Sequence, residues 1–255
     1  MEQSLYGKVA LITGAGQGIG QGIALSLAKR GAHIVAVGRT LSKCEATVAI
    51  IRERFDIEAV AIACDIGDLK NLDATMAKSL DAFGRLDILV NNAVNTRIGP
   101  LLSADINDVQ AGFRVGPFAT LRLMQLAYPY LKAQGGGSII NMASTAAKRW
   151  DMSNYGVYAA DKEAIRALTR AAACEWGIDG IRANCILPHA ASPALAGWAK
   201  HRPEEAEAFI SGIPLRRIGD CEADIGEFVA VLCGPESQYV SGQSIAVDGG
   251  HAHLG

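Results

Sequence analysis

Seven short apolar runs, separated by longer stretches with helical spacing, constrain the fold of this chain most strongly. The runs are KVALIT (8–13), HIVAVG (33–38), AVAIAC (59–64), LDILVN (86–91), GSIINMA (137–143), IRANCIL (181–187) and QSIAVD (243–248). Most are continuously apolar rather than alternating, which is typical of parallel strands covered on both faces. Because such strands are joined by right-handed helical crossovers, the pattern predicts an α/β fold with a doubly wound parallel seven-stranded sheet and helices on both faces.

The whole chain, residues 1–255, is expected to form a single catalytic domain, because 255 residues fit one α/β core and no linker or low-complexity segment divides them. The least regular segment is 188–218, which carries prolines, histidines and a tryptophan. We interpret it as a loop-plus-helix insertion that covers the active site as a substrate lid.

Composition excludes several classes of function. A net charge of −2 does not indicate a nucleic-acid or anionic-membrane partner. The six cysteines form no C-x-x-C pair, so neither a metal site nor a disulfide framework is predicted. No signal peptide or membrane-spanning apolar run is recognised, so we expect a soluble, cytoplasmic protein with reduced thiols.

The stretch TGAGQGIG (13–20) directly follows the first predicted strand and opens the first helix. Glycines allow a sharp turn and let backbone N–H groups approach a pyrophosphate, and the helix N-terminus adds positive potential. The alternative is a tight strand-to-helix turn without a ligand. The residues predicted to bind phosphate are Gly14, Gly16, Gln17, Gly18, Ile19 and Gly20.

The T-G-x-x-x-G-x-G spacing resembles that of the short-chain dehydrogenase/reductase family. Further motifs in the family's order are CDI (64–66), LVNNAV (89–94), IINMAS (139–144), YAADK (158–162), IRANCILP (181–188) and SGQSIAVDGG (241–250). This resemblance covers nearly the whole chain. It implies a Rossmann-like fold, a nicotinamide cofactor, and hydride transfer between the cofactor and a small-molecule carbonyl or alcohol. It also implies a homotetramer, formed through the fourth and fifth helices and the C-terminal strand.

The end of the second predicted strand indicates which nicotinamide cofactor is preferred. NAD-selective proteins usually have an acidic residue there, whereas this chain has Gly38 followed by Arg39 and Thr40. Arginine can pair with the 2′-phosphate of NADP(H), so NADP(H) is favoured and NAD(H) is the alternative. A solvent-exposed arginine without this role is the other interpretation, since the glycine turn offers Gln17 rather than a second basic residue.

Other cofactor contacts are implied by the resemblance. Asp65 and Ile66 would border the adenine, and the backbone near Asn91 and Ala93 the adjoining ribose. Lys162 would hold the nicotinamide ribose, with Tyr158, Pro188 and Ser192 also against the cofactor. For Asn91, a capped turn after a strand is the alternative.

Two tyrosines compete for the role of acid–base catalyst. Tyr158 and Lys162 are four residues apart and share one face of a helix, whereas Tyr155 is seven residues from Lys162. A nearby ammonium stabilises a phenolate, which makes tyrosine a better acid–base group near neutral pH. We therefore predict Tyr158 and Lys162 as catalytic, as the resemblance also implies. Ser144, at the end of the fifth strand, is predicted to donate a hydrogen bond to the substrate oxygen.

Three positions depart from the family. Phe113 stands where an asparagine usually holds a water that relays protons to the lysine. Val94 replaces a glycine and narrows the site, and His189 replaces the glycine after Pro188. His189 is interpreted either as a polar contact near the substrate or as an ordinary loop histidine.

The expected substrate pocket mixes aromatic, apolar and hydrogen-bonding groups, as small-molecule pockets do. Its candidate residues are Val94, Asn95, Thr96, Trp150, Met152, Tyr155, His189 and Trp198. This lining favours a bulky or cyclic, mostly apolar ketone or alcohol, although Arg97 would suit a carboxylate-bearing substrate. Trp198 has an alternative role as a packing anchor of the lid.

Two competing functions were weighed. The first is a cofactor-binding protein whose catalysis is lost or weak, acting as a sensor or scaffold. The second is a lyase resembling halohydrin dehalogenases, but those lack the phosphate-binding glycines that this chain keeps. An oxidoreductase is therefore the predicted function.

Overall fold

The computed structural model describes residues 3–95, 98–148, 154–191 and 193–252. Within them, seven parallel strands form one sheet in the order β3-β2-β1-β4-β5-β6-β7. The strands are β1 (Val9–Thr13), β2 (His33–Gly38), β3 (Ala59–Ala63), β4 (Ile88–Asn91), β5 (Gly137–Met142), β6 (Ile181–Pro188) and β7 (Ser244–Val247). Each predicted apolar run forms a strand, with ends that differ by at most two residues. The doubly wound, Rossmann-like sheet is thus confirmed.

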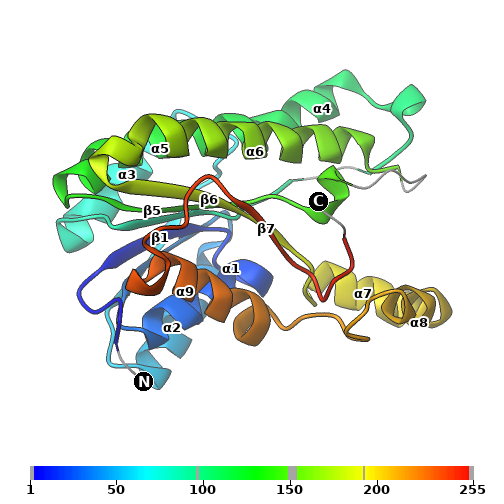
Figure 1. Ribbon diagram of the computed structural model, residues 1–255, viewed down its shortest axis with the longest axis horizontal. Helices are drawn as coiled ribbons and strands as arrows, with labels where there is room; N and C mark the ends of the chain where they lie inside the picture. Colours follow the sequence, from blue (N-terminus) through cyan, green and yellow to red (C-terminus); the bar gives the residue numbers. More distant parts are fainter. Residues whose placement is uncertain (1–2, 96–97, 149–153, 192, 253–255) are drawn as a thin grey trace.

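Helices cover both faces of this sheet (Figure 1). One face carries α1 (Gly18–Lys29), α2 (Leu41–Arg54) and α9 (Glu227–Cys233), and the other carries α3 (Asn71–Phe83), α5 (Ala119–Ala133) and α6 (Gly156–Trp176). Strand β1 shows why both faces must be covered. Ala10 and Ile12 belong to the core beneath α1, whereas Val9 and Leu11 belong to the core beneath α5. Period-two alternation of side chains along a strand therefore buries apolar residues on both sides.

The helix α4 (Ile106–Phe113) does not end at Phe113 but passes through a π-helical turn, η2 (Arg114–Phe118), into α5. Pro117 lies inside this turn and cannot donate a backbone hydrogen bond, which favours irregular helix geometry there. Gly116 faces α6, because a Cβ at Gly116 would lie 1.9 Å from Oδ1 of Asp161. The turn therefore brings backbone very close to the helix that carries the predicted catalytic pair.

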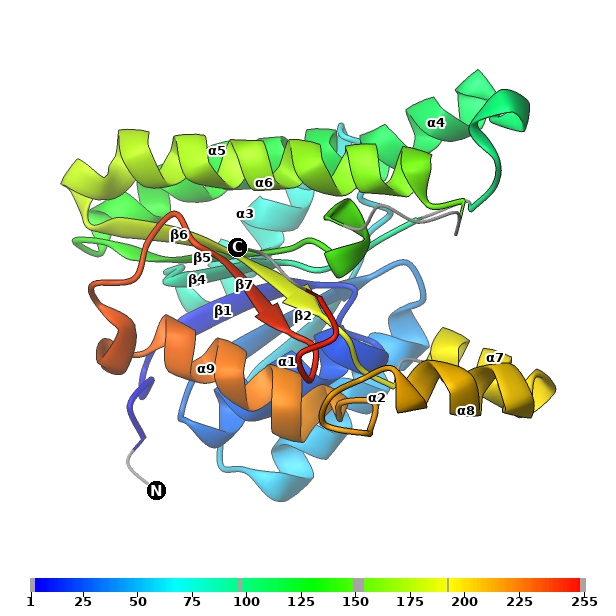
Figure 2. The same ribbon diagram turned by 45° about the vertical axis from the view of Figure 1, so that its right-hand side comes forward.

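The segment predicted as a loop-plus-helix insertion contains two helices, α7 (Pro193–His201) and α8 (Pro203–Ser211). They extend away from the sheet beyond the carboxyl ends of the strands (Figures 1 and 2). Pro203 at the first position of α8 suits a helix start, because that residue needs no amide donor.

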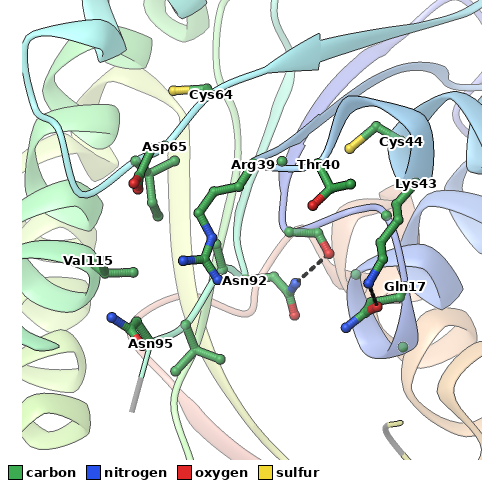
Figure 3. A pocket seen from close by; sticks show the side chains of 18 of the residues that line it. Gln17, Arg39, Thr40, Lys43, Cys44, Cys64, Asp65, Asn92, Asn95 and Val115 are labelled. Carbon is green, nitrogen blue, oxygen red and sulfur yellow. Dashed lines mark hydrogen bonds between the residues drawn. The ribbon is translucent and has the colours of Figure 1, made fainter. Parts of the chain in front are cut away.

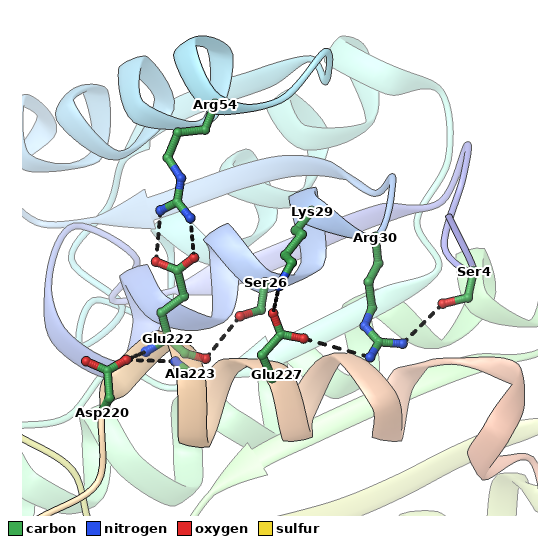
Figure 4. A network of polar contacts seen from close by, with 9 residues as sticks. All are labelled: Ser4, Ser26, Lys29, Arg30, Arg54, Asp220, Glu222, Ala223 and Glu227. Atoms are coloured by element: carbon green, nitrogen blue, oxygen red, sulfur yellow. Dashed lines mark hydrogen bonds and ion pairs between the residues drawn. The ribbon is translucent and has the colours of Figure 1, made fainter. Parts of the chain in front are cut away.

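The C-terminal helices are fixed to α1 and α2 by close backbone contact and ion pairs (Figure 4). The turn η5 (Cys221–Gly226) precedes α9 and crosses α1, and a Cβ at Gly22 would lie 2.2 Å from the carbonyl oxygen of Cys221. Arg54 pairs with Glu222, and Lys29 pairs with Glu227, each at 2.6 Å. These contacts hold α1, which begins at the glycine turn, firmly against the rest of the domain.

Candidate active site

A cavity of about 310 Å³ lies at the carboxyl ends of the first strands (Figure 3). Thirteen of its lining residues were predicted from the sequence: Gly14, Gly16, Gln17, Gly18, Ile19, Gly20, Arg39, Thr40, Asp65, Ile66, Ala93, Val94 and Asn95. Val94 and Asn95 were expected in the substrate pocket, and here they line the same cavity as the glycine turn. Asn91 is not among the lining residues, and its side-chain amide donates to Oδ1 of Asn141 at 2.8 Å.

The glycine turn needs its glycines for two different reasons. Gly14 and Gly18 have φ values of 69° and 57°, in the left-handed region that side chains rarely adopt. A Cβ at Gly20 would lie 2.2 Å from the carbonyl oxygen of Gly14. The backbone therefore lines the cavity directly, at the N-terminus of α1, where N–H groups and the helix dipole favour a phosphate.

Asn92 braces this turn, a role that the sequence analysis did not predict for it. Its Nδ2 donates to the carbonyl oxygens of Thr13 and Gly14, at 2.9 and 3.3 Å. In return, Oγ1 of Thr13 accepts from the backbone N–H groups of Asn92 and Ala93, both at 3.0 Å. In the sequence, Asn92 is visible as the second asparagine of LVNNAV. The turn whose backbone it binds lies almost eighty residues earlier in the chain, so the sequence pattern does not show the pairing.

Two basic residues face this cavity. Arg39 extends into it from the end of β2, and Lys43, on the first turn of α2, donates to Oε1 of Gln17 at 2.6 Å (Figure 3). The sequence analysis predicted Arg39 but not Lys43. Lys43 is a second basic residue beside Arg39, whereas the glycine turn itself has Gln17 and no basic residue. Asp65 also lines the cavity, and its carboxylate accepts from the backbone N–H of Gly67 at 3.0 Å.

The predicted catalytic pair lies in the first two turns of α6. Lys162 is buried, and its Nζ donates to the carbonyl oxygen of Met142 at 2.9 Å and lies 5.6 Å from the centroid of the Tyr158 ring. Met142 ends β5, and Ser144 follows two residues later, where its Oγ accepts from the N–H of Ala146. The bond from Lys162 therefore joins the helix that carries Tyr158 and Lys162 to the strand end that precedes Ser144.

Tyr155 precedes α6 and stacks obliquely on Tyr158, with ring centroids 5.8 Å apart. Between Tyr158 and Lys162, Asp161 is 4% exposed. Burial raises the pKa of the Asp161 carboxyl to about 6, and the charge of Lys162 opposes that rise only in part. The sequence analysis did not single out Asp161, although the signal was an acidic residue inside YAADK.

A second cavity, of about 340 Å³, lies between α4, the N-terminal half of α6 and the loop that follows β4. Tyr158, Asp161 and Phe113 line its inner part, and Asp105 and Ser103 line it near the surface. The cavity therefore extends from exposed residues to Tyr158.

His189 and Trp198 line neither cavity. The His189 ring stacks on His251 at 5.5 Å and meets Phe209 of α8 edge-on at 5.1 Å, and Trp198 of α7 packs edge-on against the same Phe209. This ring cluster joins α7 and α8 to the C-terminal segment, which favours a packing role for Trp198. Pro188 is the last residue of β6 and pairs with Val247. Thr96, Trp150, Met152 and Ser192 lie outside the described residues.

No helix among the described residues is both long and apolar enough to cross a membrane. No group of three or more His, Cys, Asp or Glu side chains in the same part of the chain is arranged to hold a metal ion.

Known proteins resemble this chain over nearly its whole length. The sequence model of a family described as enoyl-(acyl carrier protein) reductase matches residues 14–252. A 12α-hydroxysteroid dehydrogenase from Clostridium sp. is 37% identical over 251 residues, covering 96% of both chains. A tropinone reductase homolog from Arabidopsis thaliana is 34% identical and covers 97% of this chain and 93% of its own.

Solved structures with the same fold include enzymes with bound nicotinamide cofactors. A 7α-hydroxysteroid dehydrogenase complexed with NADH and 7-oxo glycochenodeoxycholic acid superposes with a TM-score of 0.92 at 33% identity, covering 99% of this chain and 97% of that one. A chain described as a gluconate 5-dehydrogenase from Beutenbergia cavernae, with bound NADP, gives 0.90 at 31% identity, covering 98% and 99%.

Proposed function

The chain belongs to the short-chain dehydrogenase/reductase family and is an NAD(P)-dependent oxidoreductase, and we propose that it interconverts a cyclic ketone and its secondary alcohol with NADP(H) as the preferred cofactor. The main supporting observation is the Tyr158–Lys162 pair, which is held to the end of β5. Tyr158 lines the second cavity, which shares Asn95 with the glycine-lined one. A sensor or scaffold without catalysis is not favoured, because the compared relatives are dehydrogenases and reductases.

Two features of the cavity suit a bound dinucleotide. Left-handed Gly14 and Gly18 leave backbone N–H groups free of side chains, and α1 presents its N-terminus to the same space. Asp65, Ile66 and Ala93 would border the adenosine part, and Lys162 the nicotinamide ribose, with Pro188 and Ser192 nearby. When bound, the cofactor supplies or accepts the hydride.

The protein's own residues handle the proton. In the reducing direction, the Tyr158 hydroxyl donates its proton to the substrate oxygen as that oxygen gains negative charge. The buried ammonium of Lys162 stabilises the resulting phenolate, because opposite charges attract strongly where water is excluded. Ser144 donates a hydrogen bond to the same substrate oxygen and orients it.

The preference for NADP(H) is supported by two cations and a missing acid. Gly38 ends β2, where a carboxylate would repel a 2′-phosphate, and Arg39 and Lys43 both line the cavity. A phosphate between them would gain charge-assisted hydrogen bonds from both side chains. Arg39 is solvent-exposed, but it also lines the cavity, which favours contact with a bound cofactor over the alternative without this role.

The substrate class is supported by the relatives and by the residues around Tyr158. Hydroxysteroid dehydrogenases and a levodione reductase are among the similar proteins. Tyr155 stacks beside Tyr158 and supplies an aromatic wall for a cyclic compound. The helices α7 and α8 would form the lid over it, within the single domain of residues 1–255.

We further propose a cytoplasmic homotetramer. Support comes from the exposed apolar side chains of Leu102, Ile106 and Phe118 on and beside α4 and α5. All six cysteines are free thiols, as expected in a reducing compartment.

A panel of cyclic ketones and alcohols, assayed with NADPH and NADH through the nicotinamide absorbance, tests the function. We expect turnover with a higher kcat/KM for NADPH, and Arg39→Ala should remove most of that preference. Arg170→Ala, which removes an exposed arginine of α6 that does not line the cavity, is the matched control. An NADH preference in the unmodified enzyme would refute the cofactor assignment, and no turnover of any compound while NADPH binds would refute the catalytic one.

A further inference from the structure

The carboxyl of Asp161 is buried, and the neighbouring charge of Lys162 offsets the effect of that burial only in part. Asp161 is 4% exposed, and among the described residues its Oδ1 has no hydrogen-bond partner. A buried carboxyl without partners is destabilising when it is charged, so such groups are rarely kept without a reason. Burial accordingly raises the pKa of Asp161 to about 6, so that both its protonated and its charged form exist near neutral pH.

The backbone of η2 leaves space for the carboxyl of Asp161. Gly116 of η2 faces it, and a Cβ there would lie 1.9 Å from Oδ1 of Asp161. Any other residue at position 116 would displace the carboxyl or the helix. The π-helical turn therefore leaves a space that the acid group of Asp161 occupies, and π-helical turns of this kind are frequent at functional sites.

Asp161 and Tyr158 line the same cavity of about 340 Å³ between α4 and α6. Because each water in the liquid occupies about 30 Å³, this space can hold a chain of several waters. The exposed side chains of Ser103 and Asp105 line the same cavity near the surface. The cavity therefore extends from exposed residues near the surface to Asp161 and Tyr158.

The charged and titratable groups around Asp161 come from two helices. Tyr158 and Lys162 flank it on α6, and Asp105 and Asp108 line the cavity from α4. Phe113, also on α4, lines the cavity but cannot carry a proton. Of the carboxyls there, Asp161 is the buried one and is adjacent in sequence to Lys162.

We propose that Asp161 relays protons between solvent and the Tyr158–Lys162 pair through water in this cavity, an inference that rests on the proposed oxidoreductase function. In reduction, Tyr158 gives its proton to the substrate oxygen and becomes a phenolate. The carboxyl of Asp161 then gives a proton to that phenolate through the cavity water and becomes a carboxylate. Solvent returns a proton to Asp161, so that each turnover consumes one hydride and one solvent proton.

The test compares Asp161→Asn with Asp108→Asn, which removes a carboxyl from the same cavity without removing the buried one. Both are assayed with NADPH and the best carbonyl substrate of the panel, from about pH 5 to pH 9. For Asp161→Asn we expect kcat to fall by about tenfold or more, with an unchanged KM for NADPH and a larger solvent deuterium isotope effect. Asp108→Asn should keep the unmodified rate and isotope effect.

Added formate provides a readout that a structural role would not affect. A small acid that enters the cavity should restore much of the rate of Asp161→Asn and leave the unmodified enzyme unchanged. An Asp161→Asn enzyme with the pH profile and isotope effect of the unmodified protein would overturn the relay and leave the proposed function standing. If the unmodified enzyme turns over no carbonyl or alcohol, both proposals fall together. Should Asp161→Asn fail to fold, Asp161→Ser takes its place, and an unchanged pH profile and isotope effect in that variant, which has no carboxyl, would count against the relay.

Discussion

Lys162 donates a hydrogen bond from Nζ to the carbonyl oxygen of Met142, at 2.9 Å. This bond ties the second turn of α6 to the last residue of β5, two residues before Ser144. It also holds the ammonium 5.6 Å from the centroid of the Tyr158 ring. A side chain with four rotatable bonds is thereby fixed in one position, which reduces the entropic cost of placing its charge beside a phenolate.

Replacing this ammonium should change both the rate and its pH dependence. In Lys162→Met, no positive charge stabilises the phenolate, so kcat/KM should fall by about 10² or more. The ascending limb of the pH profile for alcohol oxidation should also move to higher pH. Steady-state assays from about pH 6 to pH 11 measure both effects. Arg170→Ala, which removes an exposed arginine from the same helix, serves as a control with little change. An unshifted limb in Lys162→Met would contradict the proposed role.

Lys43 should contribute to NADPH binding but not to NADH binding. Losing a charge-assisted hydrogen bond to the 2′-phosphate should raise the Kd of NADPH in Lys43→Ala by about tenfold. Nicotinamide fluorescence titrations at two salt concentrations measure this, and the unmodified protein should lose NADPH affinity more steeply with salt than the variant. Equal losses for NADPH and NADH would mean that Lys43 acts through the glycine turn, by way of Gln17, rather than on the phosphate.

Asp161→Asn should stabilise the protein in a pH-dependent way. The folded carboxyl has a pKa of about 6 and the unfolded one about 3.8, so the unfolded state loses its proton first as pH rises. The free energy of unfolding of the unmodified protein should therefore fall between about pH 4 and pH 6, whereas the asparagine variant lacks this fall. Above that window we expect Asp161→Asn to be more stable by about 1 to 3 kcal/mol, and below it equally stable.

Denaturant unfolding at about pH 3.5 and pH 7.5 tests this difference in cofactor-free protein, independently of any activity. A variant that is less stable at both pH values would show that the carboxyl makes favourable contacts through water that outweigh its burial. Asp108→Asn again provides the comparison.

Alanine should have opposite effects at two helical glycines. Alanine normally favours a helix by up to about 1 kcal/mol over glycine. At Gly22 of α1, however, its Cβ would lie 2.2 Å from the backbone of Cys221, so Gly22→Ala should cost about 1 to 3 kcal/mol. At Gly197 of α7 no atom of the described residues, apart from its chain neighbours and the helix's own backbone, lies within 4 Å of the added Cβ, so Gly197→Ala should stabilise. Thermal unfolding of both variants checks the two signs, and a neutral Gly22→Ala would mean that η5 can move away from α1.

Much of the fold could be predicted because its signals are local. A continuously apolar run such as HIVAVG (33–38) must be covered on both faces whatever its neighbours are, and this requirement predicts a parallel strand. The break between α7 and α8 was not resolved by the sequence pattern, although Pro203 is a residue that starts helices.

The candidate site was predicted where its residues share one element. Tyr158 and Lys162 lie four apart on one helix, and their common face follows from helix geometry alone. Lys43 was missed because its partner Gln17 lies on another segment, 26 residues away. The brace from Asn92 to the glycine turn depends likewise on two strands lying side by side.

The sequence by itself determined the strands, the glycine turn and the catalytic spacing, because periodicity, glycine's conformational freedom and helix geometry act over a few residues. Only the tertiary structure decided that Asp161 is buried against Gly116 and shares a cavity with Tyr158. The same holds for the hydrogen bond from the Lys162 ammonium to the carbonyl oxygen of Met142. Burial and solvent access depend on which distant segments meet, and in this protein they distinguish an ordinary acidic residue from one that we propose carries the proton.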